Sequence, residues 1–241
     1  MDYYLAPTKN PMYTVMADKI SPTPKTKKCI VLDLDQTLIA TQDKISSIHK
    51  LGLLSDPKVS WIRDRTYCVK VDDIDSPGEG ITCDFWGLLR PYTQEFLLFC
   101  FSYFELVCVW SAGKRDYVEA MVDVIFKDLP QPHVVFTYDD VVFDANGKLR
   151  KPLTKMMSHT EEFSRKMKPE NCFILDDNKE TFRYNVGNAI HIPPYNPKLN
   201  KSELSREETA LLQVKSWLMR PDVAESEDVR KLDKSGIFEM K

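Results

Sequence analysis

Two aspartates stand two positions apart where an apolar run near the start of the chain ends. Residues 30–32 have the character of a buried strand, and Asp33 and Asp35 follow at once. An unpaired carboxylate is costly to bury, so two of them at the end of a strand need a ligand or a cation to compensate their charge. The pattern therefore predicts a chemical site at this end of the strand.

Other polar residues stand close to the ends of later apolar runs. Ser111 follows one run, Asp176 and Asp177 close another, and Lys151 begins a helical stretch after a turn. Ligands of open α/β sheets bind beyond the carboxyl ends of the strands, so these side chains are expected to meet the first two aspartates. Two carboxylates, a hydroxyl and a lysine suit phosphoryl transfer, with the lysine and an acid-bound Mg²⁺ neutralising the phosphate.

The elements that must position these residues alternate along the chain. Strands are expected at 29–34, 104–110, 133–137, 172–176 and 189–192. Helix spacing of apolar residues predicts helices at 91–103 and 114–129, the second ended by Pro130. Alternating helices and fully apolar strands indicate an α/β fold, a doubly wound and mainly parallel sheet covered on both faces.

One segment, at about 44–90, interrupts this alternation. TYCVKV (66–71) and ITCDF (81–85) alternate with a period of two, and the turn sequence SPGEG separates them. They predict a small antiparallel β insert, not another crossover helix. The apolar faces of the two runs could meet to form a substrate-reading surface, or they could pack the insert onto the main sheet.

The ends of the chain are expected to lie outside the main domain. Residues 1–27 predict an irregular N-terminal arm, 28–220 the domain with its β insert, and 221–241 a charged, loosely held C-terminal tail. A capping box, with Ser205 as N-cap and Glu208 three positions later, predicts a helix at 205–220 that closes the domain.

Composition excludes several classes of protein. The 241 residues are 43% hydrophobic and 29% charged, and the net charge of −3 gives no footprint for nucleic acid or anionic membranes. Six cysteines without a CxxC pair and only four histidines argue against disulfides and a zinc site. No secretory or membrane-spanning segment is recognisable, so we expect a soluble intracellular protein, in the cytoplasm or nucleus.

The motif DLDQT (33–37) resembles the DxDxT signature of the haloacid dehalogenase (HAD) superfamily. The rest of the chain resembles its C-terminal-domain phosphatase family, the NIF-like or FCP/SCP-type group, from about residue 28 to the C-terminal helix. The matching stretches are LLRPYTQEFLLFC, VWSAGKRDYVEAMVDVI, GKLRKPLTKM and FILDDNKETFRYNVGNAIHI. The SAG that follows Trp110 is similar to members encoded by large DNA viruses, for which the compartment would be the host cell.

The resemblance implies a two-step transfer. Asp33 would attack phosphorus and form an aspartyl-phosphate, and Asp35 would protonate the leaving oxygen and then activate the hydrolytic water. Thr37, Ser111 and Lys151 would bind the substrate phosphate.

The family's Mg²⁺ site also carries over onto this chain. Asp33, the backbone carbonyl of Asp35 and Asp177 would hold the ion, and Asp176 would support them. Asp177 stands where the family has Asn, which adds negative charge near the metal. The turn before Lys151 lacks the family's basic substrate-contacting residue, so the substrate preference of known relatives does not transfer directly.

Each candidate also has a structural interpretation. Asp33 and Asp35 could be solvated strand-end carboxylates, Ser111 could cap a helix, and Lys151 taken alone resembles a surface lysine. His191 is expected to be a satisfied structural histidine.

Three functions compete at this point. The first is a Mg²⁺-dependent phosphatase acting on phosphoserine or phosphothreonine of a protein, without direct contact to nucleic acid or membrane. The second is a HAD-type phosphatase acting on a small metabolite or a nucleic-acid end, and the third is a catalytically weak phosphoprotein-binding module. The full set of acidic, hydroxyl and lysine residues argues against the third. Metabolite phosphatases of the superfamily usually carry a large cap domain, whereas this sequence predicts only the small β insert and no large cap domain, which favours a chain-like substrate such as a phosphopeptide.

Overall fold

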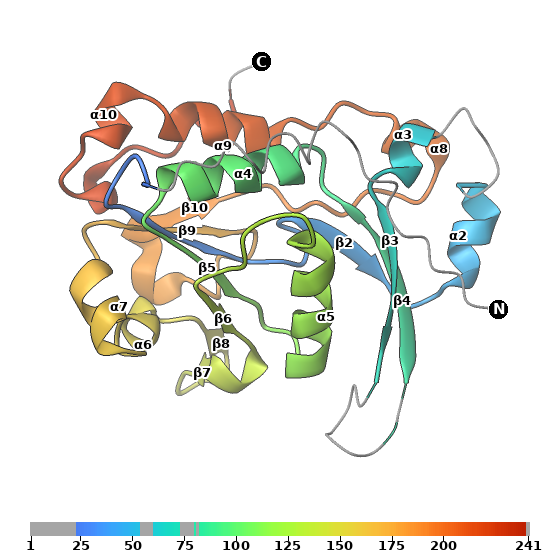
Figure 1. Ribbon diagram of the computed structural model, residues 1–241, viewed down its shortest axis with the longest axis horizontal. Coiled ribbons are helices and arrows are strands. Elements are labelled where there is room, and N and C mark those ends of the chain that lie inside the picture. Colours follow the sequence, from blue (N-terminus) through green and yellow to red (C-terminus); the bar gives the residue numbers. More distant parts are fainter. Residues whose placement is uncertain (1–22, 54–59, 73–79, 81, 240–241) are drawn as a thin grey trace.

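The computed structural model describes residues 23–53, 60–72, 80 and 82–239, and a parallel sheet forms its centre (Figure 1). The strands of this sheet lie in the order β10–β9–β1–β5–β6. They are β1 (Cys29–Leu32), β5 (Leu106–Trp110), β6 (Val134–Phe136), β9 (Cys172–Asp176) and β10 (Ala189–His191). All five pair in parallel at the positions of the apolar runs, so the predicted fold class is confirmed.

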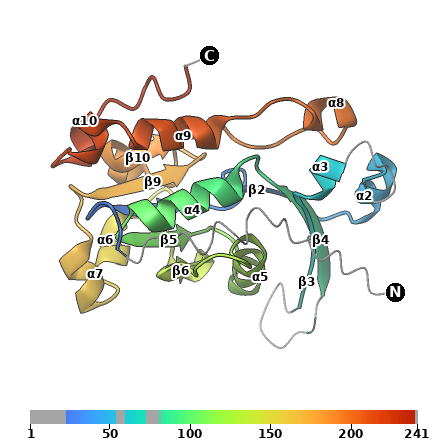
Figure 2. The same ribbon diagram turned by 45° about the horizontal axis from the view of Figure 1, so that its top comes forward.

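Helices cover both faces of this sheet. They are α4 (Thr93–Tyr103), α5 (Arg115–Ile125) and α9 (Ala210–Leu218) on one face, and α6 (Leu153–Met157) and α7 (Glu161–Lys166) on the other. Figure 2 shows α4 and α9 on the side opposite α6 and α7. In β1, Ile30 and Leu32 enter the first core and Cys29 and Val31 the second. No helix in the described part of the chain is long and apolar enough to cross a lipid bilayer.

A second, antiparallel sheet stands beside the main one (Figure 1). Its strands, in the order β2–β4–β3, are β2 (Ile39–Gln42), β3 (Thr66–Val71) and β4 (Cys83–Leu89), with α2 (Ser46–Leu51) and α3 (Ser60–Arg63) nearby in sequence. The predicted β insert is confirmed. Strand β2 is not among the predicted strands; only Leu38 separates its four residues from the DLDQT motif.

The C-terminal helix differs from its prediction. In place of one capped helix at 205–220, the chain forms α8 (Lys201–Leu204) and then α9, whose N-cap is Thr209. The prediction of a capped helix that begins at Ser205 is therefore wrong. Glu208 instead forms an ion pair of 2.8 Å with the buried Arg90, and this tertiary contact outweighs a local cap. Helices α4 and α5 lie within their expected ranges.

The segment after residue 220 is packed onto the domain. It contains α10 (Pro221–Ala224) and the 3₁₀ turn η4 (Val229–Lys231), and Val223, Val229 and Ile237 are buried. The Lys28 ammonium donates to the carbonyls of Ala224 and Ser226. The expectation of a loosely held tail is wrong up to residue 239, because apolar side chains recur between its charges. Most of the expected N-terminal arm lies outside the described residues, and the domain boundaries stay predictions.

The expectation of buried, apolar cysteines is confirmed for four of the six, and the reduced state of the thiols stays a prediction. All six are free, and Cys29, Cys100, Cys108 and Cys172 are buried in the two cores. Burial raises the pKa of all four buried thiols, which keeps them protonated and unreactive.

Candidate active site

The end of β1 places two aspartates at the middle of the sheet's carboxyl edge. β1 lies between β5 and β9, and the Asp33 amide donates to the Leu175 carbonyl at 3.0 Å. Just after Asp35 the chain reverses at Gln36, whose φ of 61° is uncommon for a residue with a side chain. The reversal leads into β2, so Asp35 lies at the junction of the main sheet and the insert.

Lys151 connects the ends of two strands. It follows β8 (Leu149–Arg150), and its ammonium donates to Asp33 Oδ1 at 2.7 Å and to Asp176 Oδ2 at 2.9 Å. Only 5% of this side chain is exposed, so the surface-lysine interpretation is wrong. Burial alone would lower the pKa of Lys151, but the two carboxylates outweigh it and raise the pKa. The ammonium is therefore held charged beside Asp33.

Asp33 and Asp177 share one buried hydroxyl. Thr37 Oγ1 lies 3.1 Å from Asp33 Oδ2 and 3.3 Å from Asp177 Oδ1, and it accepts from the Asp177 amide at 3.2 Å. The Thr37 side chain is fully buried. Its contacts hold the carboxylates in place, and its expected role in substrate binding stays a prediction.

Burial raises the pKa of the Asp33 and Asp177 carboxyl groups. It raises the pKa of Asp33, and the neighbouring charges of Asp176 and Asp35 add to this while Lys151 opposes it. Burial likewise raises the pKa of Asp177, with the charge of Asp176 as the second cause. A divalent cation would relieve this accumulation of negative charge.

Three carboxylates at this edge fit such a cation. One oxygen each from Asp33, Asp176 and Asp177 lies within 4.8 Å of the others, and carboxylate oxygens are the ligands that Mg²⁺ prefers. Both Asp176 oxygens already accept hydrogen bonds, from Lys151, Thr181 and the Asn178 amide. Asp33 accepts one hydrogen bond on each oxygen and Asp177 accepts one on Oδ1, so these two carboxylates keep more free lone pairs for a cation than Asp176 does. The exposed His191 contacts the Asp177 carbonyl through Nε2 at 2.8 Å, as expected of a satisfied histidine.

Ser111 lies at the end of β5, beside β1. Its amide donates to the Phe136 carbonyl at 3.0 Å, and its hydroxyl accepts from the Gly113 amide at 3.0 Å. The N-cap of α5 is Lys114, so the alternative that Ser111 caps this helix is wrong. The hydroxyl proton is not used by the Gly113 contact and can be donated to a ligand oxygen.

Asp35 is held by one hydroxyl from helix α5 and one from strand β2 of the insert. Tyr117 Oη of α5 donates to Asp35 Oδ1 at 2.5 Å, and Thr41 Oγ1 of β2 donates to the same oxygen at 3.1 Å. Burial raises the pKa of Asp35, while the two hydroxyls lower it. A carboxyl group whose pKa is raised by burial holds its proton more firmly than an exposed aspartate, which suits a proton donor.

Sequence reasoning does not find the hydroxyl partners of Asp35. Tyr117 fits the helix spacing of α5 as an apolar position, and Thr41 belongs to the unpredicted strand β2. The only available signal is the position of Tyr117 inside the stretch VWSAGKRDYVEAMVDVI.

A buried arginine, also missed, holds the backbone that carries Lys151. Arg150 donates to Asp144 Oδ2 at 2.6 Å, to Glu180 Oε2 at 3.0 Å and to the Glu180 carbonyl at 2.7 Å. Asp144 lies in the turn between β7 (Val142–Phe143) and β8, and Glu180 follows β9. Arg150 thus fastens the Lys151 segment to the loop that carries Asp177.

The apolar faces of β3 and β4 lie side by side in the insert. Val69 pairs with Phe85 and Val71 with Cys83, while Ile81 lies outside the described residues. Tyr67 and Val71 are buried. Tyr67 therefore belongs to the packing interpretation, and half-buried Val69 and Phe85 are the residues left to contact a substrate.

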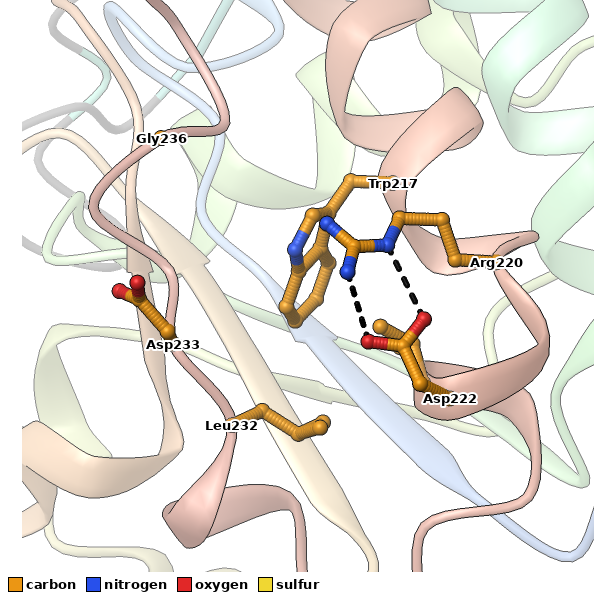
Figure 3. A pocket seen from close by; sticks show the side chains of 7 residues that line it. Trp217, Arg220, Asp222, Leu232, Asp233 and Gly236 are labelled. Carbon is orange, nitrogen blue, oxygen red and sulfur yellow. Dashed lines mark hydrogen bonds and ion pairs between the residues drawn. The ribbon is translucent and has the colours of Figure 1, made fainter.

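A separate pocket of about 160 Å³ lies between α9, α10 and the C-terminal segment (Figure 3). Arg220 lines it, but both guanidinium contacts go to Asp222, at 3.0 and 2.7 Å. Asp233 also faces the pocket. With its cation already neutralised and two carboxylates present, this pocket does not suit a phosphate.

Sequence comparison matches residues 28–230 to the family described as NLI interacting factor-like phosphatase. A curated relative, the CTD phosphatase-like protein 355R of Invertebrate iridescent virus 3, is 26% identical over 199 residues, which are 80% of this chain and 95% of that protein. This relative agrees with the resemblance to virus-encoded members.

Two solved structures share the fold. Fission yeast RNA polymerase II CTD phosphatase Fcp1 bound to beryllium fluoride matches with a TM-score of 0.54 and 17% identity, over 79% of this chain and 49% of that one. A second structure of Fcp1, described as an essential RNA polymerase II CTD phosphatase, matches with a TM-score of 0.52 and 17% identity, over 86% of this chain and 58% of that one. The chain thus spans about half the length of these two structures.

Proposed function

Because the chain belongs to the NLI interacting factor-like phosphatase family, we propose that it is a Mg²⁺-dependent protein phosphatase acting on phosphoserine or phosphothreonine. The observation that carries the proposal is the buried Lys151 ammonium between Asp33 and Asp176. It places a fixed positive charge beside a carboxylate at the sheet edge where ligands bind.

In the first step, Asp33 attacks phosphorus while the bond from phosphorus to the serine oxygen breaks. Asp35 gives its proton to that oxygen, so the products are a free hydroxyl and an aspartyl-phosphate. In the second step, Asp35 takes a proton from water, the water oxygen attacks phosphorus, and the bond to Asp33 breaks. Inorganic phosphate leaves, and both carboxyl groups return to their starting state.

The surrounding residues orient and neutralise the phosphate. Lys151 and Ser111 donate to its oxygens, and Asp33, the Asp35 carbonyl and Asp177 would hold Mg²⁺. Bound there, the ion supplies positive charge that offsets the carboxylates and the phosphate. Each Asp33 oxygen has one protein partner, so lone pairs remain for attack.

Two features favour a peptide substrate. Only 40 positions separate Ser111 from Lys151, which leaves no room for a large cap that would enclose a metabolite. On the insert, Val69 and Phe85 form a half-buried apolar surface, and Phe85 packs edge-to-face on Tyr117 at 5.3 Å. Because Tyr117 contacts Asp35, this surface adjoins the acid. We expect it to contact an apolar residue or proline next to the phosphorylated one.

The test is hydrolysis of a phosphoserine peptide library by the purified chain with Mg²⁺, with sugar phosphates and nucleotides in parallel. Wild type should prefer peptides, a chelator should stop turnover, and Asp33→Asn should abolish it. Asp123→Asn, on the exposed side of α5, is the matched control and should stay active. Faster hydrolysis of a metabolite than of every peptide would reject the protein-phosphatase function.

A further inference from the structure

Three hydroxyl groups gather beside the Asp35 carboxylate, and they come from separate elements. Tyr117 Oη and Thr41 Oγ1 both donate to Oδ1, at 2.5 and 3.1 Å, and lie 2.8 Å from each other. Tyr67 Oη of β3 lies 2.7 Å from Thr41 Oγ1. Oδ2 has no hydrogen-bond partner among the described residues, so the arrangement distinguishes the two oxygens of one carboxylate.

The path of the Tyr67 side chain depends on a glycine. Gly87 of β4 pairs with Thr41 on one side and with Tyr67 on the other. A Cβ at Gly87 would lie 2.4 Å from Tyr67 Oη and 2.6 Å from its Cζ, closer than real side chains approach. The missing side chain lets the Tyr67 ring cross the middle strand and reach Thr41 on the far strand. The insert is thus shaped to bring this hydroxyl to the site.

The number of protons on each group indicates which atoms donate and which accept in this network. Each hydroxyl has one proton to donate, and the ionised carboxylate can only accept. Tyr67 therefore donates to Thr41, Thr41 donates to Asp35, and Tyr117 donates to Asp35. Two of these protons, those of Thr41 and Tyr117, thus lie on Oδ1, and the Tyr67 proton lies on Thr41 Oγ1. When Asp35 is protonated, its own proton belongs on Oδ2, the oxygen left to face the leaving group.

We propose that Thr41 and Tyr117, with Tyr67 acting through Thr41, are positioning residues that fix Asp35 so that Oδ2 carries the transferred proton. The inference rests on the proposed function of Asp35 as general acid. It gives the insert a second role: beyond any contact with a peptide, two of its strands hold the acid that acts on the substrate.

The experiment compares Thr41→Val and Tyr117→Phe on two substrates in the presence of Mg²⁺. A phosphoserine peptide has an alkoxide leaving group that needs a proton, and p-nitrophenyl phosphate has one that does not. The measured quantity is kcat/KM, which reports formation of the aspartyl-phosphate. We expect losses of about 10- to 100-fold on the peptide, part of the ~10²–10⁴-fold effect of a positioned acid, and losses below about threefold on the aryl phosphate.

Two matched control variants each remove a buried hydroxyl that has no contact with Asp35. Tyr103→Phe loses a 2.6 Å bond to the Leu218 carbonyl, and Thr66→Val loses a 2.9 Å bond to the Ile62 carbonyl. Both should keep the wild-type ratio between the substrates. Thr41→Ser, which keeps the hydroxyl, should recover the peptide activity that Thr41→Val loses.

A double-mutant cycle tests whether Tyr67 acts on Asp35 through Thr41. Tyr67→Phe should lower peptide kcat/KM by less than Thr41→Val does, and it should have no further effect in the Thr41→Val background. Independent, multiplying effects of the two substitutions would overturn the assignment of Tyr67 to a role through Thr41.

A spectroscopic readout tests the contact without turnover. The short Tyr117 bond to a carboxylate should give a low-field hydroxyl proton resonance in the metal-free protein, lost in Tyr117→Phe and Asp35→Ala but kept in Tyr103→Phe. Absence of this resonance in wild type would overturn the proposal even if the purified protein is inactive.

If the protein is active, the kinetic comparison decides. Equal losses of kcat/KM on the peptide and the aryl phosphate, or no loss on either, would overturn the proposal. If Asp35→Asn shows the selective loss and the hydroxyl variants do not, the phosphatase mechanism stands and the positioning role is wrong.

Discussion

Replacing Lys151 with methionine is expected to destabilise the protein and to inactivate it. Its ammonium lies 2.7 Å from Asp33 and 2.9 Å from Asp176, and the three side chains are at most 10% exposed. Breaking a buried ion pair typically costs about 3–5 kcal/mol, because the partner charge stays buried without compensation. An exposed pair contributes only ~0.2–1 kcal/mol. The ion pairs of Lys151 are of the buried kind, so the larger cost applies.

Urea unfolding of the metal-free protein measures this cost. Lys151→Met should lower the free energy of unfolding by about 3–5 kcal/mol, or the melting temperature by roughly 10 °C for a domain of this size. The control Lys148→Met removes an exposed ammonium 3.2 Å from Glu180 and should cost below ~1 kcal/mol.

Adding Mg²⁺ should then stabilise Lys151→Met more than wild type. Removing the ammonium leaves the acidic site more negative, so the cation should bind it more tightly and favour the folded state. Equal stability of Lys151→Met and Lys148→Met without metal would refute the buried ion pair. Equal stabilisation of wild type and Lys151→Met by Mg²⁺ would refute a metal site beside Lys151.

Three further substitutions test other parts of the site. Asp177→Ala should raise the Mg²⁺ concentration needed for half-maximal activity, and an unchanged titration would assign the ligand role to Asp176. Arg150→Met should lower the free energy of unfolding by about 2–4 kcal/mol and also reduce turnover. The reason is that Arg150 is buried and bonded to Asp144 and Glu180 on either side of the site. Full activity of this variant would show that the position of Lys151 does not depend on Arg150. Phe85→Ala should reduce kcat/KM for peptides with an apolar neighbour and spare p-nitrophenyl phosphate, and a uniform loss on both would mean that Phe85 only packs the insert.

The parts of the fold that the sequence predicts are those set by local pattern. Each main strand is an apolar run that both cores require, and each candidate side chain follows from its place near a strand end. Lys151 is 118 positions from Asp33, so spacing alone could not join them. The rule that ligands bind at the carboxyl edge, together with the family motifs, supplied that link.

The features that sequence reasoning missed depend on tertiary contacts. The capping box at Ser205 is locally favourable, but Glu208 pairs with Arg90, which is 118 positions away. Tyr117 satisfies the helix pattern whether its hydroxyl is used or not. The contact from Tyr67 to Thr41 requires the pairing of three strands and a glycine on the middle one. No periodicity in a single run contains that information.

In the proposed mechanism, Asp33 carries the phosphoryl group between the two steps. The most direct test is acid quenching of Asp35→Asn during reaction with p-nitrophenyl phosphate and Mg²⁺, followed by mass spectrometry of the proteolytic peptides. Without a base to activate water, this variant should accumulate phosphate on the peptide that contains Asp33, and Asp33→Asn should carry none. Release of nitrophenol by Asp35→Asn without any phosphorylated peptide, or with phosphate on another residue, would contradict the account.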